Sequence, residues 1–443
     1  MAGSKESLQF NRFEIISNED GKSIDLRSGT PRIEYRESVF VPYVTITAAI
    51  VDTGNAAAAP EEASGTISVL NSIKCQGTET ILFNIEDGRG NKIKLDKPND
   101  LRVDETNLIT ESFKSTSFIM TVVSKEAYDN SLLETRCRTN YSGKISDIAQ
   151  TIIKQNLKSN KKIFVDGTEN SLSQFGKDRY PFEMLLSLQK MSIPTIQNSK
   201  GESAKGKMAG YLFWQTSEGF HFKSLDKLFD KNGKTIKRYV FNHKVDSQKI
   251  PNGYDDKILY HRVNRTTQGL QQFYSGAFGT VLEVYDEVTK TYTKAAPFTA
   301  KEKGNGIIAA KTLPVVNPEY KDKATVRIVA QAAKGQLVVP GDSYKSQNEK
   351  KTTPNFVVEE ILQQSRQNYR QKFNMSVDII IPADFSLHAG DLVYCDFPQP
   401  TTTKTIKPTP VYSGIYMISD LCHFGTRSKT FTGLHLVRDS YGK

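Results

Sequence analysis

The sequence predicts a mainly β protein of the α+β class, in which two antiparallel β domains flank mixed helix and strand domains. Three observations predict this class. Residues 11–124 carry β-branched and aromatic side chains in partial alternation, residues 145–157 switch to helical spacing, and residues 375–439 return to strand-like segments. At 443 residues the chain is too long for one compact core and suits roughly two to four domains.

The first predicted domain, residues 8–135, is an antiparallel β domain. Segments such as "RIEYRESVF" and "YVTITAAIVD" alternate apolar with polar residues, as strands with one buried face do. The stretch "GNAAAAPEEASG", residues 54–65, is predicted to be a loop in spite of its alanines, because Pro60 and the glycines break any helix.

Residues 136–235 are predicted to form a helix and hairpin domain. In "SGKISDIAQTIIKQNLK" the apolar residues recur three and four positions apart, which places them on one helical face. The segment "RYPFEMLLSLQKMS" predicts a second helix, with Pro181 in its first turn and Pro194 beyond its end. Large side chains in "GYLFWQTSEGFHFKSLDKLF" alternate around a turn at residues 217–219, which predicts a hairpin.

Residues 236–354 are predicted to be a mixed β segment with a lysine-rich loop insertion, part of which joins the last domain. Strands are expected within residues 256–294 and at "ATVRIVAQ", and "GDSYKSQNEKKTTP", residues 341–354, is expected to be an exposed linker or mobile loop. Residues 355–443 are predicted to form the second β domain, with a leading helix at residues 355–373 and four strands after it.

Composition and charge exclude several classes of protein. No stretch approaches the roughly 18 consecutive apolar residues of a membrane span, and the N-terminal residues lack the layout of a signal peptide. The four cysteines lie far apart without a CxxC pair, so reduced thiols in a cytoplasm fit best. The net charge of +10 could attract nucleic acid, but its lysines and arginines fall in short groups beside acids, as on a solvated surface.

The residues that carry chemistry form no recognisable set, so we expect a protein that is not an enzyme, with no catalytic residue, cofactor or metal. No two of the six histidines have HxH or HExxH spacing. "GNGIIA", residues 304–309, shares glycines with the dinucleotide fingerprint, but Pro314 prevents the long helix that must follow, which favours a flexible loop.

The stretch "HAGDLVYCDFPQP", residues 388–400, concentrates polar and thiol groups in a short space. Asp391 is better explained as a turn residue that bonds nearby backbone than as a metal ligand. Cys395 shares a strand face with Val393 and Phe397, which favours a small buried hydrophobe over a reactive thiol. We therefore interpret this stretch as the start of a strand.

The order of these segments resembles that of the central baseplate hub proteins of contractile-tailed bacteriophages, a family structurally similar to the hub part of type VI secretion spikes. The early run "EYRESVFVPYVTITAAIVD" is similar to the family's Glu-Ser before a strand that ends in Asp, and "IKCQGTETILFNI" to its Gly-x-Glu step into a strand. The end, "GIYMISDLCHFGTRSKTFTGLHLVRDSYG", resembles the family's Gly-x-Tyr-x-Ile strand, His-bearing turn and closing strand. The resemblance covers nearly the whole chain except residues 300–354.

The resemblance implies a structural role. Such hubs are homotrimers in which each subunit gives two barrel-like β tube domains to a ring of six, which continues the tail tube, holds a central spike and forms part of the DNA channel. It implies a place in the virion's tail baseplate after assembly in the host cytoplasm, with spike, tail tube or tube-initiator and other baseplate proteins as partners, and transient passage of DNA without specific binding.

For the tube and oligomer interface we expect the alternating strands around Thr45, Thr47, Tyr416 and Ile418. Because a DNA channel should avoid a strongly attractive wall, we also expect the net positive charge to lie mostly outside it. Two alternatives stay open: a tail-tip peptidoglycan hydrolase, which lysis by the purified chain would reveal, and a basic nucleic-acid-binding protein, which steeply salt-dependent binding to DNA would reveal.

Overall fold

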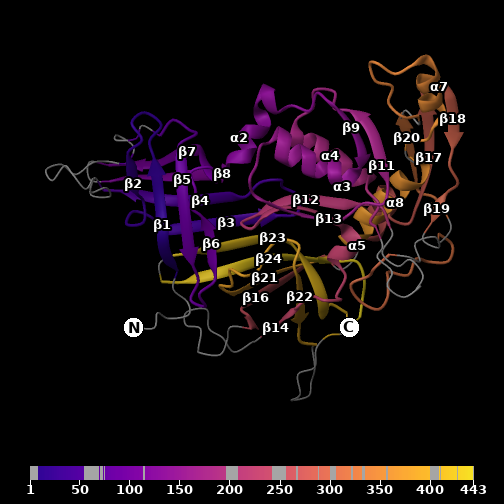
Figure 1. The fold of residues 1–443 in the computed structure, drawn as a ribbon. Helices are drawn as coiled ribbons and strands as arrows, with labels where there is room; N and C mark the ends of the chain where they lie inside the picture. The colour runs from indigo at the N-terminus through magenta and orange to yellow at the C-terminus, as the bar shows by residue number, and fades with distance from the viewer. Residues whose placement is uncertain are drawn as a thin grey trace.

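The structure is a computed structural model that describes most of the chain. The described residues are 8–53, 69, 73, 75–112, 115–195, 208–241, 256–265, 268–287, 289–299, 306–320, 323–331, 335–355, 358–399, 409, 411–426 and 428–442. The loop predicted at residues 54–65 lies outside these ranges. The protein is mainly β, as the sequence predicts, with its first and last β regions in contact and the helices packed above them (Figure 1).

The described residues of the first β region form eight antiparallel strands. They are β1 (Gln9–Ile16), β2 (Ser23–Asp25), β3 (Arg32–Ser38), β4 (Thr45–Asp52), β5 (Thr80–Glu86), β6 (Lys92–Leu95), β7 (Leu101–Glu111) and β8 (Thr116–Ser124). In β4 every second side chain is buried, beginning with Ile46, while Thr45 and Thr47 lie on the opposite, half-buried face. The alternation in the sequence therefore sets which face of each strand enters the core.

The middle region contains most of the helices. Its elements are α2 (Lys125–Ser131), the 3₁₀ turn η1 (Leu133–Thr135), β9 (Asn140–Lys144), α3 (Ile145–Thr151), the π-helical turn η2 (Ile152–Asn156), β10 (Lys162–Val165), β11 (Ser171–Phe175), α4 (Pro181–Met191), β12 (Tyr211–Thr216), β13 (Gly219–Ser224) and α5 (Leu225–Leu228). Both predicted helices and the predicted hairpin β12–β13 are confirmed. Both faces of this hairpin are buried, because separate apolar clusters cover them.

The next segment divides between two sheets. Strands β14 (Lys237–Phe241), β15 (Lys257–Ile258) and β16 (Tyr260–Arg265) join the last β region, whereas β17 (Gly279–Asp286), β18 (Thr291–Lys294), β19 (Phe298–Thr299) and β20 (Val326–Gln331) form a separate four-stranded sheet. The expected strand at "ATVRIVAQ" is β20.

Two expectations for this segment are wrong. Residues expected to be strand include the helix α6 (Gly269–Ser275), which ends at Gly276 in the left-handed conformation that caps helices. The expected linker includes the helix α7 (Tyr344–Thr352), whose cap Ser343 accepts a hydrogen bond from the backbone N–H of Ser346. A local cap marks one end of each helix. The composition of the surrounding residues does not reveal these caps, and it favours strand or loop instead.

The last region contains the predicted helix, α8 (Val358–Lys372), and the four predicted strands β21 (Met375–Pro382), β22 (Leu392–Asp396), β23 (Gly414–Gly425) and β24 (Thr430–Arg438). Strand β23 pairs antiparallel with β3, from Asp420 opposite Ser38 to Gly425 opposite Ile33. This pairing joins both β regions into one 15-stranded sheet, and none of the sheets formed by described residues closes into a barrel.

One apolar core lies beneath both halves of this sheet. Tyr35 and Ile46 from the first region belong to the same buried cluster as Ile379, Phe385 and Leu434 from the last. Because the cluster is continuous, the two β regions bury their apolar faces together. No helix in the described part of the chain is long and apolar enough to cross a membrane.

The packing of the loop before β22 against the β12–β13 hairpin can be tested by a single substitution. Gly390 has φ +95°, and a Cβ there would lie 2.6 Å from Cζ2 of Trp214. We expect Gly390→Ala to lower the free energy of unfolding by about 2–5 kcal/mol, from backbone strain plus overpacking. Gly21→Ala is the matched control, since Gly21 has φ +69° with no atom within 4 Å. We expect it to cost about 1–2 kcal/mol in urea unfolding followed by circular dichroism, and equal costs for the two variants would contradict the packing argument.

Candidate functional site

The carboxylate of Glu37 connects three separate parts of the chain. It lies at the end of β3, is 2% exposed, and accepts a 2.6 Å hydrogen bond from the Tyr35 hydroxyl. The backbone N–H of Ser217, in the turn of the β12–β13 hairpin, donates at 3.1 Å. From the loop before β22, Nδ1 of His388 lies 3.1 Å from Oε1 and the backbone N–H of Ala389 donates to Oε2 at 3.0 Å. First β region, hairpin and last β region thus meet at one side chain.

The electrostatics of this site make Glu37 and His388 a charged pair. Burial alone would raise the pKa of Glu37, but the His388 charge and the hydrogen bonds it accepts lower that pKa to about 2. Burial alone would lower the pKa of His388, but the Glu37 carboxylate raises it to about 9. At neutral pH the pair is therefore an ion pair inside the protein.

Glu37 lies in the run "EYRESVF", to which the sequence alone assigns no buried role. A signal was present, because the buried positions of β3 are Ile33, Tyr35 and Glu37. A carboxylate in the apolar register of an alternating strand needs a buried partner. The sequence does not say which partner, since His388 is 351 positions away.

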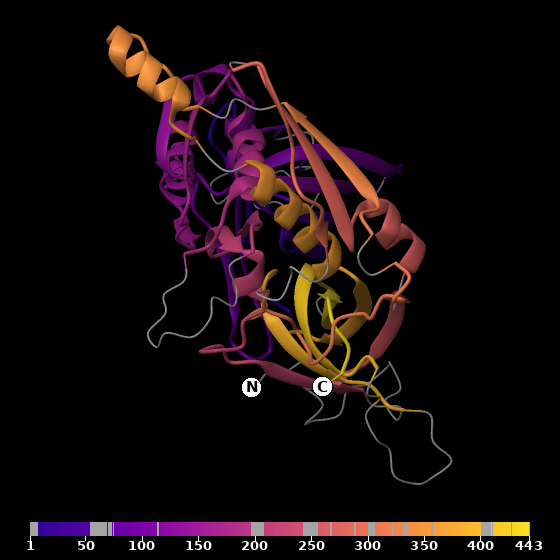
Figure 2. The same ribbon diagram turned by 90° about the vertical axis from the view of Figure 1, so that its right-hand side faces the viewer.

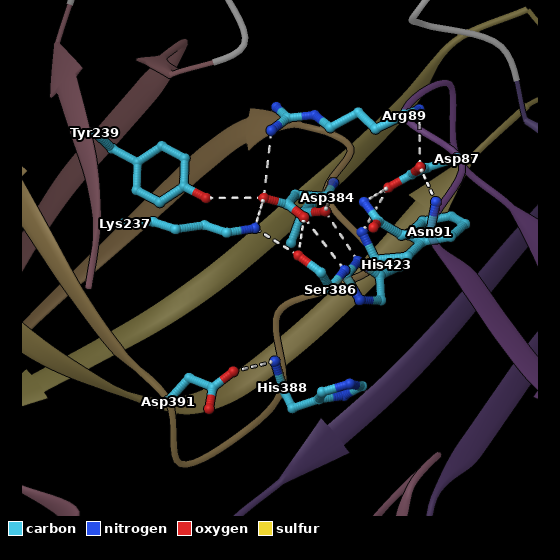
Figure 3. Close-up of polar contacts among 12 residues, drawn as sticks. Asp87, Arg89, Asn91, Lys237, Tyr239, Asp384, Ser386, His388, Asp391 and His423 are labelled. Carbon is cyan, nitrogen blue, oxygen red and sulfur yellow. Dashed lines mark hydrogen bonds and ion pairs between the residues drawn. The ribbon is translucent and has the colours of Figure 1, made fainter. Parts of the chain in front are cut away.

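A second buried carboxylate, Asp384, follows β21 in the loop that also carries His388 (Figure 3). It accepts hydrogen bonds from Nζ of Lys237 at 2.6 Å, the Tyr239 hydroxyl at 3.1 Å and the Ser386 hydroxyl at 2.5 Å, and Arg89 lies 3.4 Å away. Burial opposes ionisation, but the hydrogen bonds from Lys237 and Ser386 outweigh it and lower the pKa of Asp384. Asp384 therefore ties β14 and the β5–β6 turn to the loop.

Asp87 makes the reverse connection from that turn. It accepts the backbone N–H groups of Arg89 and Asn91, each at 2.9 Å, and that of Phe385 at 2.8 Å (Figure 3). The first β region thus contributes two buried carboxylates, Glu37 and Asp87, that bind the loop of the last region, and the last region contributes Asp384, which binds the β5–β6 turn.

The contacts of these buried carboxylates connect separate segments of the chain. Ser386 lies beside Lys237, but the Lys237 ammonium is paired with Asp384, so it is not placed as a general base for the hydroxyl. No group of three or more histidine, cysteine or acidic residues that could hold a metal occurs in the described part of the chain. What these residues do is hold three segments in register.

The stretch that begins at His388 behaves largely as the sequence predicts. Asp391 accepts the backbone N–H of His388 at 2.9 Å, which confirms its role in the turn. Cys395 is fully buried in the large core and burial raises the pKa of its thiol, which confirms a hydrophobe. The ion pair of His388 with Glu37 was not predicted.

The four expected interface residues separate into two pairs. Thr45 and Thr47 lie on the outward face of β4 and are half-buried. Tyr416 and Ile418 are fully buried in the core, with an Arg438 guanidinium 4.6 Å from the Tyr416 ring centre. Because Met417 between them belongs to another apolar cluster, both faces of this part of β23 are covered. In the single chain Tyr416 and Ile418 have a packing role, and Thr45 and Thr47 remain available to a partner.

Thr45 begins a row of outward residues that crosses the join between the two β regions. Thr45 lies opposite Arg36 on β3, which lies opposite Cys422 on β23, then Gly433 on β24 and Ile380 on β21. Directly opposed residues share a face of a sheet. A hollow of about 530 Å³ lies over this row. We call the outward side of β4, β3, β23, β24 and β21 the joint face.

The joint face has an unusual charge composition for this chain. The sequence has 59 lysines and arginines, but no lysine occurs in any of these five strands. Arg32 and Arg36 both pair with Glu34 at 2.5 Å. The positive charge of the chain is therefore concentrated elsewhere.

No protein-family model matches the chain, and no curated protein matches it in sequence. Solved structures do match. The tail protein from Neisseria meningitidis MC58 is 8% identical with a TM-score of 0.50, over 97% of this chain and 96% of that one. The chain has the fold of this tail protein. Along nearly its whole length it is structurally similar to phage tail proteins and type VI secretion hub proteins.

Two further solved structures that are similar to the chain come from a prophage tail and from a type VI secretion system. The 43 kDa tail protein of prophage MuSo2 from Shewanella oneidensis is 10% identical with a TM-score of 0.47, over 96% of this chain and 98% of that one. The E. coli c3393 protein, a type VI secretion component with structural similarity to T4 tail proteins gp27 and gp5, is 8% identical with a TM-score of 0.41, over 98% of this chain and 78% of that one. At such identities the likeness concerns the fold, and function needs separate evidence.

The Glu37–His388 pair predicts a specific pH dependence of stability. Because the folded-state pKa of His388 is about 9 against an ordinary value of 6.5, its contribution is complete below pH 6.5 and lost as pH rises through 9. Because that of Glu37 is about 2 against 4.5, its contribution is complete above pH 4.5 and lost as pH falls through 2. Stability from this pair is therefore greatest between about pH 4.5 and 6.5.

The substitution His388→Asn tests the alkaline side, since its amide keeps a neutral donor near Nδ1. We expect wild-type protein to lose up to about 3 kcal/mol between pH 6.5 and 9.5 in urea unfolding, and the variant to lose little over the same range. His435→Asn is the matched control, because His435 pairs with the partly exposed Asp378 at the surface. If His388→Asn lost as much unfolding free energy as the wild type between pH 6.5 and 9.5, the Glu37–His388 pair would not be the cause of that loss.

Proposed function

We propose that the chain is the structural hub of a phage tail baseplate, a homotrimer whose pseudo-six-fold ring connects the tail tube to a central spike and forms part of the DNA channel. The observation that carries the proposal is the joint face, which both β regions build. Its place would be the virion tail, after assembly in the host cytoplasm.

The symmetry of the strands around the join supports a ring of six. On one side β3 is followed by β4, β8 and β7, and on the other β23 is followed by β24, β21 and β16, all in antiparallel pairs. Each side thus presents a hairpin extended by two strands. Three chains with two similar surfaces each can match a six-fold tube, because closed rings repeat one contact.

The composition of the joint face supports its assignment to the channel wall. A lysine-rich wall would bind phosphates and retain DNA, whereas a wall of Thr45, Thr47 and paired charges offers little net attraction. The two half-buried threonines are the lumen candidates that we retain. Subunit contacts, tail tube, spike and other baseplate proteins would occupy other surfaces.

A structural role also accounts for the buried polar groups. Glu37 and Asp384 are fully used in holding segments together, and neither is presented to a substrate. We therefore propose that the chain is not an enzyme. Release of soluble fragments from purified peptidoglycan by the chain alone would contradict this.

The first test of the hub is the particle itself. We expect electron micrographs of the purified chain to show three-fold rings with six inner lobes, and mass photometry to give the mass of three chains. The measurement is repeated with the spike protein present, because a trimeric spike raises the local concentration of subunits. A single-chain mass under both conditions would overturn the proposal.

The second test concerns the channel wall. In the trimer, Thr45→Lys together with Thr47→Lys should strengthen binding of short duplex DNA and steepen its salt dependence by up to about two units of slope, since each lysine can neutralise one phosphate. The control places lysines at Ser346 and Asn348 on α7, outside the joint face. Equal strengthening by both variants, measured by fluorescence anisotropy, would refute the assignment of the wall.

A further inference from the structure

A groove lies beside α8 and is distinct from the hollow over the joint face. Its volume is about 530 Å³, and it is bounded by α8, α6, the last turn of α4, β20 and Phe40 of the β3–β4 turn. Figure 2 shows α8 between the magenta helices and the β17–β20 sheet. The helix contributes a stripe of side chains at three and four residue spacing: Leu362, Ser365, Arg366, Tyr369, Arg370 and Phe373.

The charge of the groove is of one sign. Lys190, Arg366 and Arg370 line it, and none of the described residues that line it is an aspartate or glutamate. Nε of Arg366 donates to the backbone carbonyl of Ser275 at 3.1 Å, which uses one of the five N–H groups of the guanidinium. Burial, and then the charge of Arg370, lowers the pKa of Arg366. Three cations with no acidic side chain among the described residues of the lining favour an anion in this groove.

The floor of the groove contains buried polar atoms that lack partners in the described part of the chain. Asn374 is 3% exposed, and its Oδ1 accepts from Gln272 while its Nδ2 has no acceptor. Ser365 is 2% exposed, and its hydroxyl has no partner. A buried donor without an acceptor costs about 1–3 kcal/mol, so an acceptor that reached these groups would stabilise them.

The mouth of the groove has an apolar side. Phe40 is 52% exposed although its ring packs on Phe373, with 5.1 Å between the ring centres. Leu362 and Ile328 line the same groove. An exposed aromatic beside unpaired cations is the composition of surfaces that bind proteins.

We propose that this groove binds an acidic peptide segment of a partner protein, whose carboxylates bind Lys190, Arg366 and Arg370 and whose apolar side chain packs on Phe40. The amide of Gln271 at the groove suits the hydrogen bonds of a peptide backbone. A nucleic acid fits less well, because single-stranded chains need cations along an extended track with stacking platforms. The site does not rest on the ring or the channel, since one chain supplies all of its residues.

The test uses the full chain and fluorescence anisotropy. The probes are a short labelled peptide that alternates Asp and Glu with Leu and Phe, the same peptide with Asn and Gln for its acids, and an oligo-dT strand. We expect the acidic peptide to bind at least about tenfold more tightly than its amide counterpart and than the oligonucleotide. Binding should weaken as NaCl rises from about 50 to about 200 mM.

Substitutions then locate the site. We expect Arg370→Glu and Lys190→Glu, both at exposed positions, to weaken binding of the acidic peptide by about tenfold or more. Phe40→Ala should weaken it with little change in salt dependence. The matched control is Lys345→Glu, an exposed lysine on α7 outside the groove. The proposal is overturned if the amide peptide or the oligonucleotide binds as tightly as the acidic one, or if Lys345→Glu weakens binding as much as Arg370→Glu.

Discussion

One buried ion pair, Glu37 with His388, connects three distant segments of the fold. A carboxylate removed from water is costly unless charge and hydrogen bonds replace its hydration, and Glu37 finds these only where three segments converge. The partners of this one group therefore specify the position of β3, of the β12–β13 hairpin and of the loop before β22. Apolar packing alone tolerates small shifts between segments, whereas a buried charge does not.

The same principle recurs around this pair. Asp384 and Asp87 connect the two β regions from opposite sides, so the join does not rely on the β3–β23 hydrogen bonds alone. Lys372 is likewise fully buried, between Asp226 and Asp439 at 3.4 and 3.0 Å. That cluster fixes the end of α8, and with it the helix that lines the groove.

These buried groups leave two surfaces with opposite character. The joint face has no lysine and pairs Arg32 and Arg36 with Glu34, while the described lining of the groove beside α8 has three cations and no acid. The net charge of +10 is thus distributed unevenly over the surface. Its distribution is more informative about binding surfaces than its total. Under the two proposals, DNA would pass along the first surface and an acidic peptide would bind to the second.

The sequence by itself determined the elements and the face of most strands. Period-two and helical spacing identified β3, β4, α3, α4, α8 and the four closing strands, because burial of one face leaves a periodic pattern. Capping at Ser343 and Gly276 was present in the sequence but too local to outweigh the composition around it. The sequence could not show which way Tyr416 and Ile418 face. Both faces of their strand are covered by apolar clusters, so alternation of apolar and polar residues does not distinguish the two faces. Only the tertiary structure decided that Glu37 meets His388 and that both β regions share one sheet, since such contacts join residues hundreds of positions apart and leave no local pattern.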